Sequence, residues 1–279
     1  MTSSAGRPPP SVLDAFGITD EPVLLAGGKG GTWSAGPLVV KPVEFLPETL
    51  WRAEVLHELP DSPDFRFARP VRTRDGAWVA DGWEAARLVE GEPDVRRPDD
   101  VLRAGTAFHT AISGLPRPAF LDLRDEPWSH GDRVAWEELP VEGSPAAMNL
   151  LRPLVEARRP VGLVSQVVHG DLLGNVLFAD GLPPAIIDWS VYWRPRSWAS
   201  AVAVVDALCW YGAPPGLLTG RSHLPQWGQM LIRALIYRIV THDKAFGWTA
   251  DQVDAYRPAI ELATAVAGHH TAKISSQRS

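Results

Sequence analysis

The most constraining feature of this chain is the stretch HGDLLGN (His169 to Asn175), taken with the segments directly downstream of it. Two short apolar segments come next, separated by a turn sequence at 179–184, and the second runs into IIDWS (Ile186 to Ser190). Apolar runs of this length between turn residues are typical of buried strands. If the two strands pair as a hairpin, Asn175 and Asp188 lie at the same end of it. The pattern therefore predicts a polar loop and a second carboxylate at one edge of a small hairpin.

This arrangement is suited to phosphoryl transfer. Such a site needs a carboxylate that orients or deprotonates the attacking hydroxyl, and oxygen ligands for a metal ion. Asp171 fits the first role, and Asn175 with Asp188 fits the second, since Mg²⁺ prefers oxygen ligands. The alternative is a surface loop whose Asp, Gly and Asn residues only form a turn. We favour the site, because apolar strands flank the loop and Asp188 occurs where the hairpin geometry requires it.

A glycine-rich segment lies between the first two strand-like segments of the chain. Glycines at such a turn let the backbone approach a ligand closely and point its N–H groups at phosphate oxygens. The segment is not a Walker A loop, because no Gly-Lys-Ser/Thr opens a helix here. A flexible turn is the alternative interpretation. The residues expected to meet nucleotide phosphates are Gly27, Gly28, Gly30, Gly31 and Thr32.

Lys41 ends the next strand pattern, and Glu54 stands in the helical stretch after it. A lysine among apolar residues is costly to bury without an anionic partner. Trp51, Val55 and Leu59 form an apolar helix stripe, with Glu54 beside it. We expect Glu54 to hold Lys41, and Lys41 to hold the α- and β-phosphates. The alternative is an edge-strand lysine near solvent with an unrelated surface glutamate.

The chain changes character along its length. Residues 1–20 include Pro8-Pro9-Pro10, which suits neither a ladder nor a helix, so a partly disordered tail and short lead-in are expected. Strand-like segments and one helical stretch fill residues 21–88. Residues 89–279 carry longer helical patterns at 99–113, 145–158, 197–211, 226–243 and 251–267. The predicted fold class is α+β, with a small N-terminal sheet domain and a larger, mainly helical C-terminal domain.

Composition excludes several classes of function. A net charge of −6 and a pI near 5.8 argue against nucleic acid as the main partner. Cys209 is the single cysteine, so no internal disulfide can form and a reducing compartment is favoured. No apolar run approaches the roughly 18 residues of a membrane span. A cytoplasmic enzyme without membrane contact is predicted, and the oligomeric state stays open.

The ordered series as a whole resembles the aminoglycoside phosphotransferase and choline kinase-like family of small-molecule kinases. The series comprises the glycine-rich hairpin, Lys41, Glu54, the HGD loop with Asn175, and IDWS followed by VVDAL (Val204 to Leu208), and it covers roughly residues 20 to 270. The resemblance implies a two-lobed protein-kinase-like fold, with ATP bound between the lobes and Mg²⁺ as the metal.

The same resemblance assigns roles to single residues. It implies that Asp171 is the catalytic aspartate, that Asn175 and Asp188 are the metal ligands, and that Asp206 is a buried acid supporting the loop. From the residues alone, Asp206 could equally pair within the C-terminal helices. The segment Glu84 to Leu88 is the implied hinge, whose backbone would meet adenine at Ala85, Ala86 and Arg87.

The chain departs from the family's pattern in one place. Four residues usually separate the catalytic Asp from the metal-binding Asn, whereas Leu172-Leu173-Gly174 supplies three. The missing residue shortens the reach by roughly 3.3 Å. Gly174 can restore the reach of Asn175 if its backbone takes an unusual φ/ψ. The short loop also leaves open a nucleotide-binding pseudokinase or regulatory module with little or no transfer activity.

The predicted function is ATP-dependent transfer of the γ-phosphoryl group to a hydroxyl of a small molecule, such as an aminoglycoside, an amino sugar or a similar metabolite. The sequence does not identify the acceptor. Ammonium groups would need acidic partners, and aromatic faces suit a sugar or a cation. The candidate acceptor residues are the acids Asp206, Asp243, Asp251, Asp254 and Glu261 and the indoles Trp189, Trp193 and Trp198.

Overall fold

The computed structural model describes residues 6–26 and 30–276 of the chain, with side chains as far as Gly268. Residues 1–5 of the expected tail lie outside this part, as do Gly27 and Gly28. After a short first helix, the described elements are short strands around one longer helix, and then mainly helices. This order confirms the predicted α+β class.

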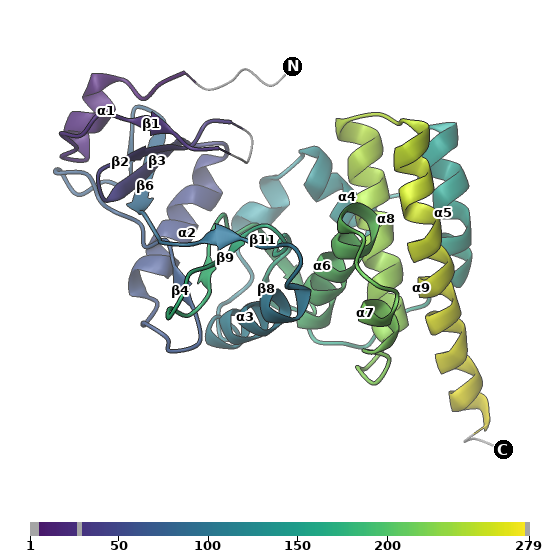
Figure 1. Ribbon diagram of the computed structural model, residues 1–279. Coiled ribbons are helices and arrows are strands. Elements are labelled where there is room, and N and C mark those ends of the chain that lie inside the picture. Colours follow the sequence, from purple (N-terminus) through teal and green to yellow (C-terminus); the bar gives the residue numbers. More distant parts are fainter. Residues whose placement is uncertain (1–5, 27–29, 277–279) are drawn as a thin grey trace. The chain divides into compact units, whose positions relative to one another are not determined.

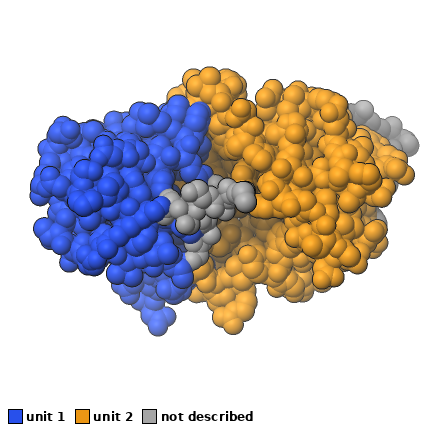
Figure 2. Space-filling view, turned by 90° about the horizontal axis from the view of Figure 1, so that it is seen from above, with its two compact units in different colours: residues 1–92, 177–187 blue, residues 93–176, 188–279 orange. Residues whose placement is uncertain are grey.

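The chain divides into two compact units, drawn in blue and orange in Figure 2. Unit 1 comprises Met1–Glu92 and Leu177–Ile187, and unit 2 comprises Pro93–Val176 and Asp188–Ser279. The boundary thus falls a few residues after the predicted one at residue 88. The segment Leu177–Ile187, which we assigned to the C-terminal domain, belongs to unit 1 instead.

Unit 1 is built on a five-stranded antiparallel sheet in the order β1-β2-β3-β6-β5. Leu38 and Val40 of β3 are buried while Val39 is partly exposed, as the two-residue period of a strand requires. Helix α2 (Leu46–Glu58) follows β3, with a proline in its first turn, where no N–H is needed. The strands, labelled in Figure 1, are β1 Val23–Leu24, β2 Trp33–Ala35, β3 Leu38–Pro42, β5 Val79–Ala80 and β6 Trp83–Arg87.

Helix α1 (Pro10–Ala15) precedes the sheet and corrects the expectation of a disordered lead-in. Val12 and Phe16 are buried in one cluster with Val40 of β3. The proline run does not prevent a helix, because Pro10 stands at its first position, where a missing N–H costs no hydrogen bond. The lead-in therefore forms part of the core of unit 1.

A second, four-stranded sheet has the order β4-β10-β9-β7. Its strands are β4 Arg66–Phe67, β7 Glu92–Pro93, β9 Val176–Phe178 and β10 Ala185–Ile186. The two apolar segments after the polar loop are thus neighbouring strands, as predicted. β10 also pairs in parallel with β4, which explains why this segment belongs to unit 1.

Unit 2 is mainly helical, and α8 packs against α4, α5, α6 and α9 (Figure 1). The five expected helical patterns are all present, whereas α4 and the strand pair β8–β11 were not predicted. No helix in the described part of the chain is both long and apolar enough to cross a membrane. The elements are α3 Pro98–Ala111, η1 Ala119–Leu123, α4 Pro127–Ala135, α5 Pro145–Ala157, β8 Gln166–His169, β11 Val191–Arg194, α6 Arg196–Tyr211, α7 Gly216–Thr219, α8 Trp227–Ala245 and α9 Ala250–Ser276.

Candidate active site

The predicted catalytic loop leaves the end of strand β8 in unit 2. His169 ends β8 and lies opposite Val191 of β11. The amide of Gly170 donates to the carbonyl of Ser190 at 3.0 Å, which extends the pairing by one residue. A Cβ at Gly170 would lie 2.4 Å from Cδ2 of Tyr192, so only glycine fits at this point of the loop. The residue before Asp171 is therefore tied closely to β11.

A buried histidine supports the loop from helix α3. The amide of His169 donates to Nε2 of His109 at 2.9 Å, and the amide of Asp171 donates to Nδ1 of His169 at 3.2 Å. Burial lowers the pKa of His109 to about 3, and the nearby His169 and Arg196 act in the same direction. A neutral His109 can accept the bond from His169, although its buried Nδ1 has no partner among the described residues. His109 is thus a packing histidine with one nitrogen unsatisfied among the described residues.

The shortened part of the loop is a tight turn. Gly174 has φ +89°, a conformation that side-chain-bearing residues rarely adopt, so the predicted unusual backbone is confirmed. The amide of Asn175 donates to the carbonyl of Leu172 at 3.0 Å. Its side-chain Nδ2 donates to the backbone carbonyl of Asp171 at 2.7 Å and to Oδ2 of that residue at 3.2 Å. The turn therefore brings the Asn175 amide beside the Asp171 carboxylate.

Arg238 of α8 joins two carboxylates at the loop. Its Nη2 donates to Oδ1 of Asp171 at 2.6 Å, and its Nε donates to Oδ1 of Asp206 at 2.8 Å. Asp206, on α6, is buried, and this burial raises its pKa although Arg238 opposes the shift. Of the two roles considered for Asp206, the structure shows pairing between helices. Asp206 thus acts on the loop through Arg238.

Sequence reasoning missed Arg238. The residue stands in the apolar run Ala234 to Val240 of α8, whose other members are nearly all buried. An arginine in such a run needs a carboxylate partner, because an unpaired buried charge is costly. The position of Arg238 among apolar residues could therefore have predicted a carboxylate partner. Asp206, which also stands among apolar residues on α6, was the matching candidate.

The predicted metal ligands are Asn175 and Asp188. The hydrogen bonds of the Asn175 side chain use its nitrogen, which leaves Oδ1 as the atom able to bind a cation. Asp188 is exposed and follows β10 with φ +45°. An amide and a carboxylate oxygen suit Mg²⁺, which also takes water and phosphate oxygens. Within residues 6–26 and 30–276, no group of three or more His, Cys, Asp or Glu side chains could hold a metal by itself. The metal-binding role of the pair stays a prediction.

The glycine-rich turn lies between β1 and β2 of unit 1, as expected. The amide of Leu25 donates to the carbonyl of Thr32 at 2.9 Å, which continues the hairpin beyond β1. Gly30 has φ +77° and open space around its Cα. Gly31 follows it into the hairpin. The binding of phosphates by Gly30, Gly31 and Thr32 stays a prediction, and Gly27 and Gly28 lie outside the described residues.

The expected ion pair of Lys41 with Glu54 is wrong. Lys41 lies opposite Glu84 in the register of β3 and β6, with 3.8 Å between Nζ and Oε1. Glu54 instead accepts a hydrogen bond from Nε1 of Trp78 at 2.6 Å and lies 3.4 Å from Nη2 of Arg72. The carboxylate beside Lys41 thus comes from a neighbouring strand.

The rotation of α2 explains this difference. We expected Trp51, Val55 and Leu59 to face the core. Leu59, just after α2, is buried, but Trp51 and Val55 are only partly buried, and the buried residues of α2 itself are Thr49, Ala53 and Leu56. Glu54 points away from that face, and its side chain is 57% exposed. Arg52 is the charged residue of α2 that approaches Glu84, at 2.8 Å.

The predicted hinge residues form part of the sheet of unit 1. Ala85, Ala86 and Arg87 lie inside β6 and pair with β3 along its whole length. On the other edge, the carbonyl of Ala85 accepts from Val71, and the amide of Arg87 donates to the carbonyl of Arg69. The Ala85 carbonyl and the Arg87 amide are therefore occupied by neighbouring backbone. The binding of adenine by this segment stays a prediction.

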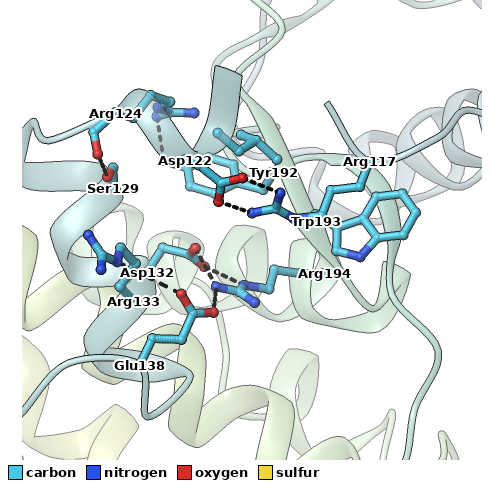
Figure 3. Close-up of a pocket in the computed structure, with 11 residues that line it drawn as sticks. Arg117, Asp122, Arg124, Ser129, Asp132, Arg133, Glu138, Tyr192, Trp193 and Arg194 are labelled. Atoms are coloured by element: carbon cyan, nitrogen blue, oxygen red, sulfur yellow. Dashed lines mark hydrogen bonds and ion pairs between the residues drawn. The ribbon is translucent and has the colours of Figure 1, made fainter. Parts of the chain in front are cut away.

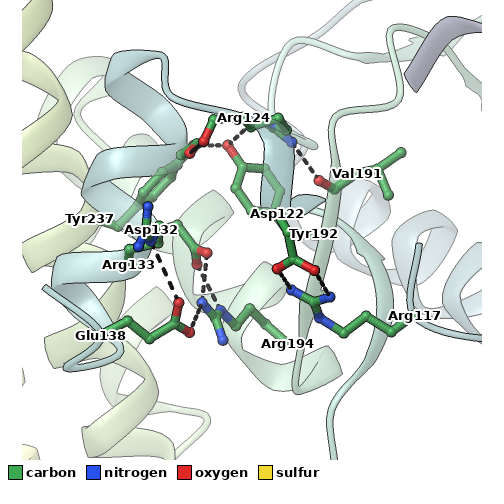
Figure 4. Close-up of polar contacts among 11 residues, drawn as sticks. Arg117, Asp122, Arg124, Asp132, Arg133, Glu138, Val191, Tyr192, Arg194 and Tyr237 are labelled. Carbon is green, nitrogen blue, oxygen red and sulfur yellow. Dashed lines mark hydrogen bonds and ion pairs between the residues drawn. The ribbon is translucent and has the colours of Figure 1, made fainter. Parts of the chain in front are cut away.

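A cavity of about 160 Å³ lies in unit 2 between β11, η1 and α4 (Figure 3). Its charged walls pair with one another. The guanidinium of Arg194 binds both oxygens of Asp132 at 2.7 and 2.8 Å and also reaches Glu138, and Arg117 binds Asp122 through two bonds (Figure 4). These bonds satisfy the arginines, so we regard the cavity as a structural salt-bridge network.

The tryptophans expected near the acceptor have different positions. Trp189 is buried, packs on Phe108 with ring centroids 5.1 Å apart, and donates to the carbonyl of Val168. Trp198 is fully buried. Trp193 lines the cavity described above. Trp189 and Trp198 therefore belong to the core, which corrects the expectation for these two.

Comparison with solved structures identifies the fold. The chain superposes on a microcompartment-associated aminopropanol kinase with a TM-score of 0.62 and 16% identity, covering 94% of this chain and 96% of that one. An aminoglycoside phosphotransferase from Alicyclobacillus acidocaldarius gives 0.57 and 17%, covering 98% of each chain. A spectinomycin phosphotransferase gives 0.53 and 14%, covering 90% of this chain and 94% of that one.

These neighbours are proteins of the kind that the sequence motifs resemble. No protein-family profile matches the sequence. No curated protein matches it at a significant level. At identities this low, the solved structures establish the fold, and the predicted small-molecule-kinase architecture is confirmed at that level.

Proposed function

We propose that this protein is an ATP-dependent kinase that phosphorylates a hydroxyl of a small molecule. The observation that carries the proposal is the loop carboxylate of Asp171, which Arg238 and Asn175 both bind. The fold supports it, because the neighbours' names describe kinases of aminopropanol, aminoglycosides and spectinomycin. The spectinomycin enzyme was solved with ADP, which supports an adenine nucleotide as the donor.

The chemistry asked of Asp171 is orientation and proton transfer. The acceptor's oxygen forms a bond to the γ-phosphorus, the bond from that phosphorus to the β,γ-bridging oxygen breaks, and ADP leaves. Asp171 accepts the hydrogen bond of the hydroxyl and takes up its proton. Because Arg238 holds Oδ1, the carboxylate cannot turn freely. Oδ2 receives only the longer bond from Asn175, so we assign it to the acceptor.

The remaining predicted residues would bind the nucleotide and its metal ion. The Asn175 amide oxygen and the Asp188 carboxylate would hold Mg²⁺, which neutralises phosphate charge when bound. Lys41 and the turn at Gly30 to Thr32, in unit 1, would bind phosphates. The side chain of Lys41 is 31% exposed, so its ammonium group can reach a ligand.

The proposal is tested by measuring ADP release with ATP, Mg²⁺ and a panel of aminoglycosides, amino sugars, amino alcohols and nucleosides. We expect at least one class to stimulate release, and Asp171→Asn to abolish that stimulation while ATP still binds. Stimulation that survives Asp171→Asn would remove this carboxylate from the mechanism.

The second candidate function is a nucleotide-binding pseudokinase or regulatory module. Two observations favour it: the three-residue loop, and the pairing of Lys41 with Glu84 in place of Glu54 of α2. ATP binding by calorimetry, without acceptor-dependent ADP release from any member of the panel, would favour this function over the kinase.

A further inference from the structure

A band of aromatic side chains lies on unit 2 where α6 and α8 end and α4 begins. We call it the aromatic belt and define it as Trp128, Trp210, His242, Phe246 and Trp248. The His242 ring stacks with both Trp210 (5.9 Å between centroids, 16° between planes) and Trp248 (4.4 Å, 24°). Phe246 extends the belt to Trp128 at 6.2 Å. Phe246 is 69% exposed and Trp210 is 38% exposed, so the belt reaches solvent.

The belt adjoins the catalytic loop. Trp210 follows Asp206 by four residues on α6, and His242 follows Arg238 by four residues on α8, so each lies one turn, roughly 6 Å, further along its helix. Helical side chains lean toward the N-terminus of their helix, here toward the Asp206–Arg238 pair. Arg238 in turn binds Asp171. The belt therefore lies one helical turn beyond the pair that holds the carboxylate assigned to phosphoryl transfer.

The acids of α4, α6 and α8 are already bonded. Asp206, the acid of α6, binds Arg238. Asp243, the acid of α8, accepts bonds from the amide of Ser144 at 3.0 Å and from Nε1 of Trp248 at 2.7 Å. Asp132, the acid of α4, binds Arg194. These three carboxylates are therefore not available to the ammonium groups of an acceptor.

We propose that the aromatic belt binds the apolar face of the acceptor, and that the acceptor is an alcohol carrying an aromatic or aliphatic ring in place of several amines. The inference rests on the proposed kinase function and deepens it by assigning a substrate class. Exposed aromatic residues near a reactive group provide stacking surfaces for a planar or cyclic ligand. The hydroxyl of such an acceptor would lie toward Asp171, with its ring on Trp210 and Phe246.

The direct test is binding, which needs no turnover. The probe is p-nitrophenyl β-D-glucopyranoside, whose ring quenches tryptophan fluorescence. Its matched control is methyl β-D-glucopyranoside, which carries the same sugar hydroxyls without the ring, and kanamycin represents polyamine acceptors. We expect the nitrophenyl glucoside to bind the belt at least about tenfold more tightly than either comparison compound, measured by quenching and by calorimetry.

Two variants locate the binding. Phe246→Ser changes an exposed side chain and is expected to weaken nitrophenyl glucoside binding about tenfold, with circular dichroism and ATP affinity unchanged. Val164→Ser, at a residue 88% exposed elsewhere in unit 2, is the matched control and should bind as the parent does. Tighter binding of kanamycin, or equal binding by the parent and Phe246→Ser, would overturn the proposal.

Two further measurements distinguish failure of the proposed kinase function from failure of the proposed ligand site. If ATP is never turned over, the proposed kinase fails, but the binding result still decides whether the belt is a ligand site. If sedimentation velocity shows a dimer that Phe246→Ser dissociates, the belt is an interface between copies of the chain and the acceptor assignment is wrong.

Discussion

The proposed catalytic loop of unit 2 and the Lys41 region of unit 1 were both predicted from short patterns. The unusual backbone expected at Gly174 is present, whereas the expected contact of Lys41 with Glu54 is absent. Asn175 reaches Asp171 within a single tight turn. Lys41 does not meet Glu54, because α2 turns a different face to the sheet. A contact inside one loop depends on a few local dihedral angles. A contact between a strand and a helix depends on how the whole helix is rotated.

The two regions also differ in how strongly their charges are bound. Arg238 and Asp206 are nearly buried, with side chains 12% and 9% exposed. Lys41 is 31% exposed and Glu84 is 17% exposed, and their charged atoms are 3.8 Å apart. Breaking a buried pair costs about 3–5 kcal/mol, whereas a solvated pair contributes up to about 1 kcal/mol. We therefore expect unit 2 to respond far more strongly than unit 1 to loss of a partner.

The largest effect is expected from Arg238→Met. This variant leaves the buried Asp206 carboxylate without its partner, so the free energy of unfolding of unit 2 should fall by about 3–5 kcal/mol in urea titrations. The double variant Arg238→Met with Asp206→Leu removes both charges and should recover most of that loss. Equal stability of the single and double variants would show that the pair does not govern unit 2.

The next effect concerns turnover. Asp171→Ala should lower acceptor-dependent ADP release at least about a hundredfold, because a positioned carboxylate is lost, while ATP affinity stays near the parent value. Asp180→Ala, at an exposed aspartate in the turn between β9 and β10, is the matched control. A comparable loss in the control would mean that the effect is not specific to the loop.

A pH effect on stability is expected from His109. Its pKa is about 3 in the folded protein and near 6.5 when unfolded, so the unfolded chain binds the extra proton first as the pH falls. Stability present above pH 6.5 is therefore lost as the pH drops toward 3, by about 2 kcal/mol between pH 7 and 5. His109→Gln keeps an acceptor for the His169 amide and should flatten this dependence in urea titrations at the two pH values. An unchanged slope would count against a neutral, buried His109.

The role of the short turn can be tested by substituting two glycines that have similar positive φ angles. Gly174→Val and Gly181→Val both place a branched residue at positive φ, +89° and +73°, and each should cost about 1–3 kcal/mol of stability. Only Gly174→Val should also lower ADP release, because it moves Asn175 away from Asp171. If Gly174→Val keeps parental turnover, the bend is not what brings Asn175 to the site.

The smallest effect belongs to unit 1. Glu84→Gln should weaken ATP binding about two- to fivefold, because Lys41 loses the carboxylate that holds it. Glu54→Gln should leave ATP affinity within about twofold of the parent by the same estimate. Calorimetric titration with ATP measures both variants. A larger loss of ATP affinity in Glu54→Gln than in Glu84→Gln would indicate that Glu54 is the partner of Lys41 in the nucleotide-bound protein.

Prediction from sequence succeeded best where pattern and element coincide. The adjacency of β9 and β10, the five expected helices of unit 2 and the unusual conformation of Gly174 could all be anticipated from local residues. The position of the hinge could not be anticipated. A strand paired inside a sheet and an extended segment that leaves the sheet show the same apolar alternation in the sequence. Ala85 and Ala86 are paired on account of β3, far from them in the sequence.

The amino-acid sequence by itself determined the α+β class, the order of the chemical groups along the chain and the loop that carries Asp171. These depend on turn residues, periodicity and short spacings, which act over a few residues. Only the tertiary structure decided that Arg238 joins Asp171 to Asp206, that Glu84 lies beside Lys41, and that Trp210 stacks on His242. Such contacts depend on the rotation and packing of whole elements, which a local pattern does not specify.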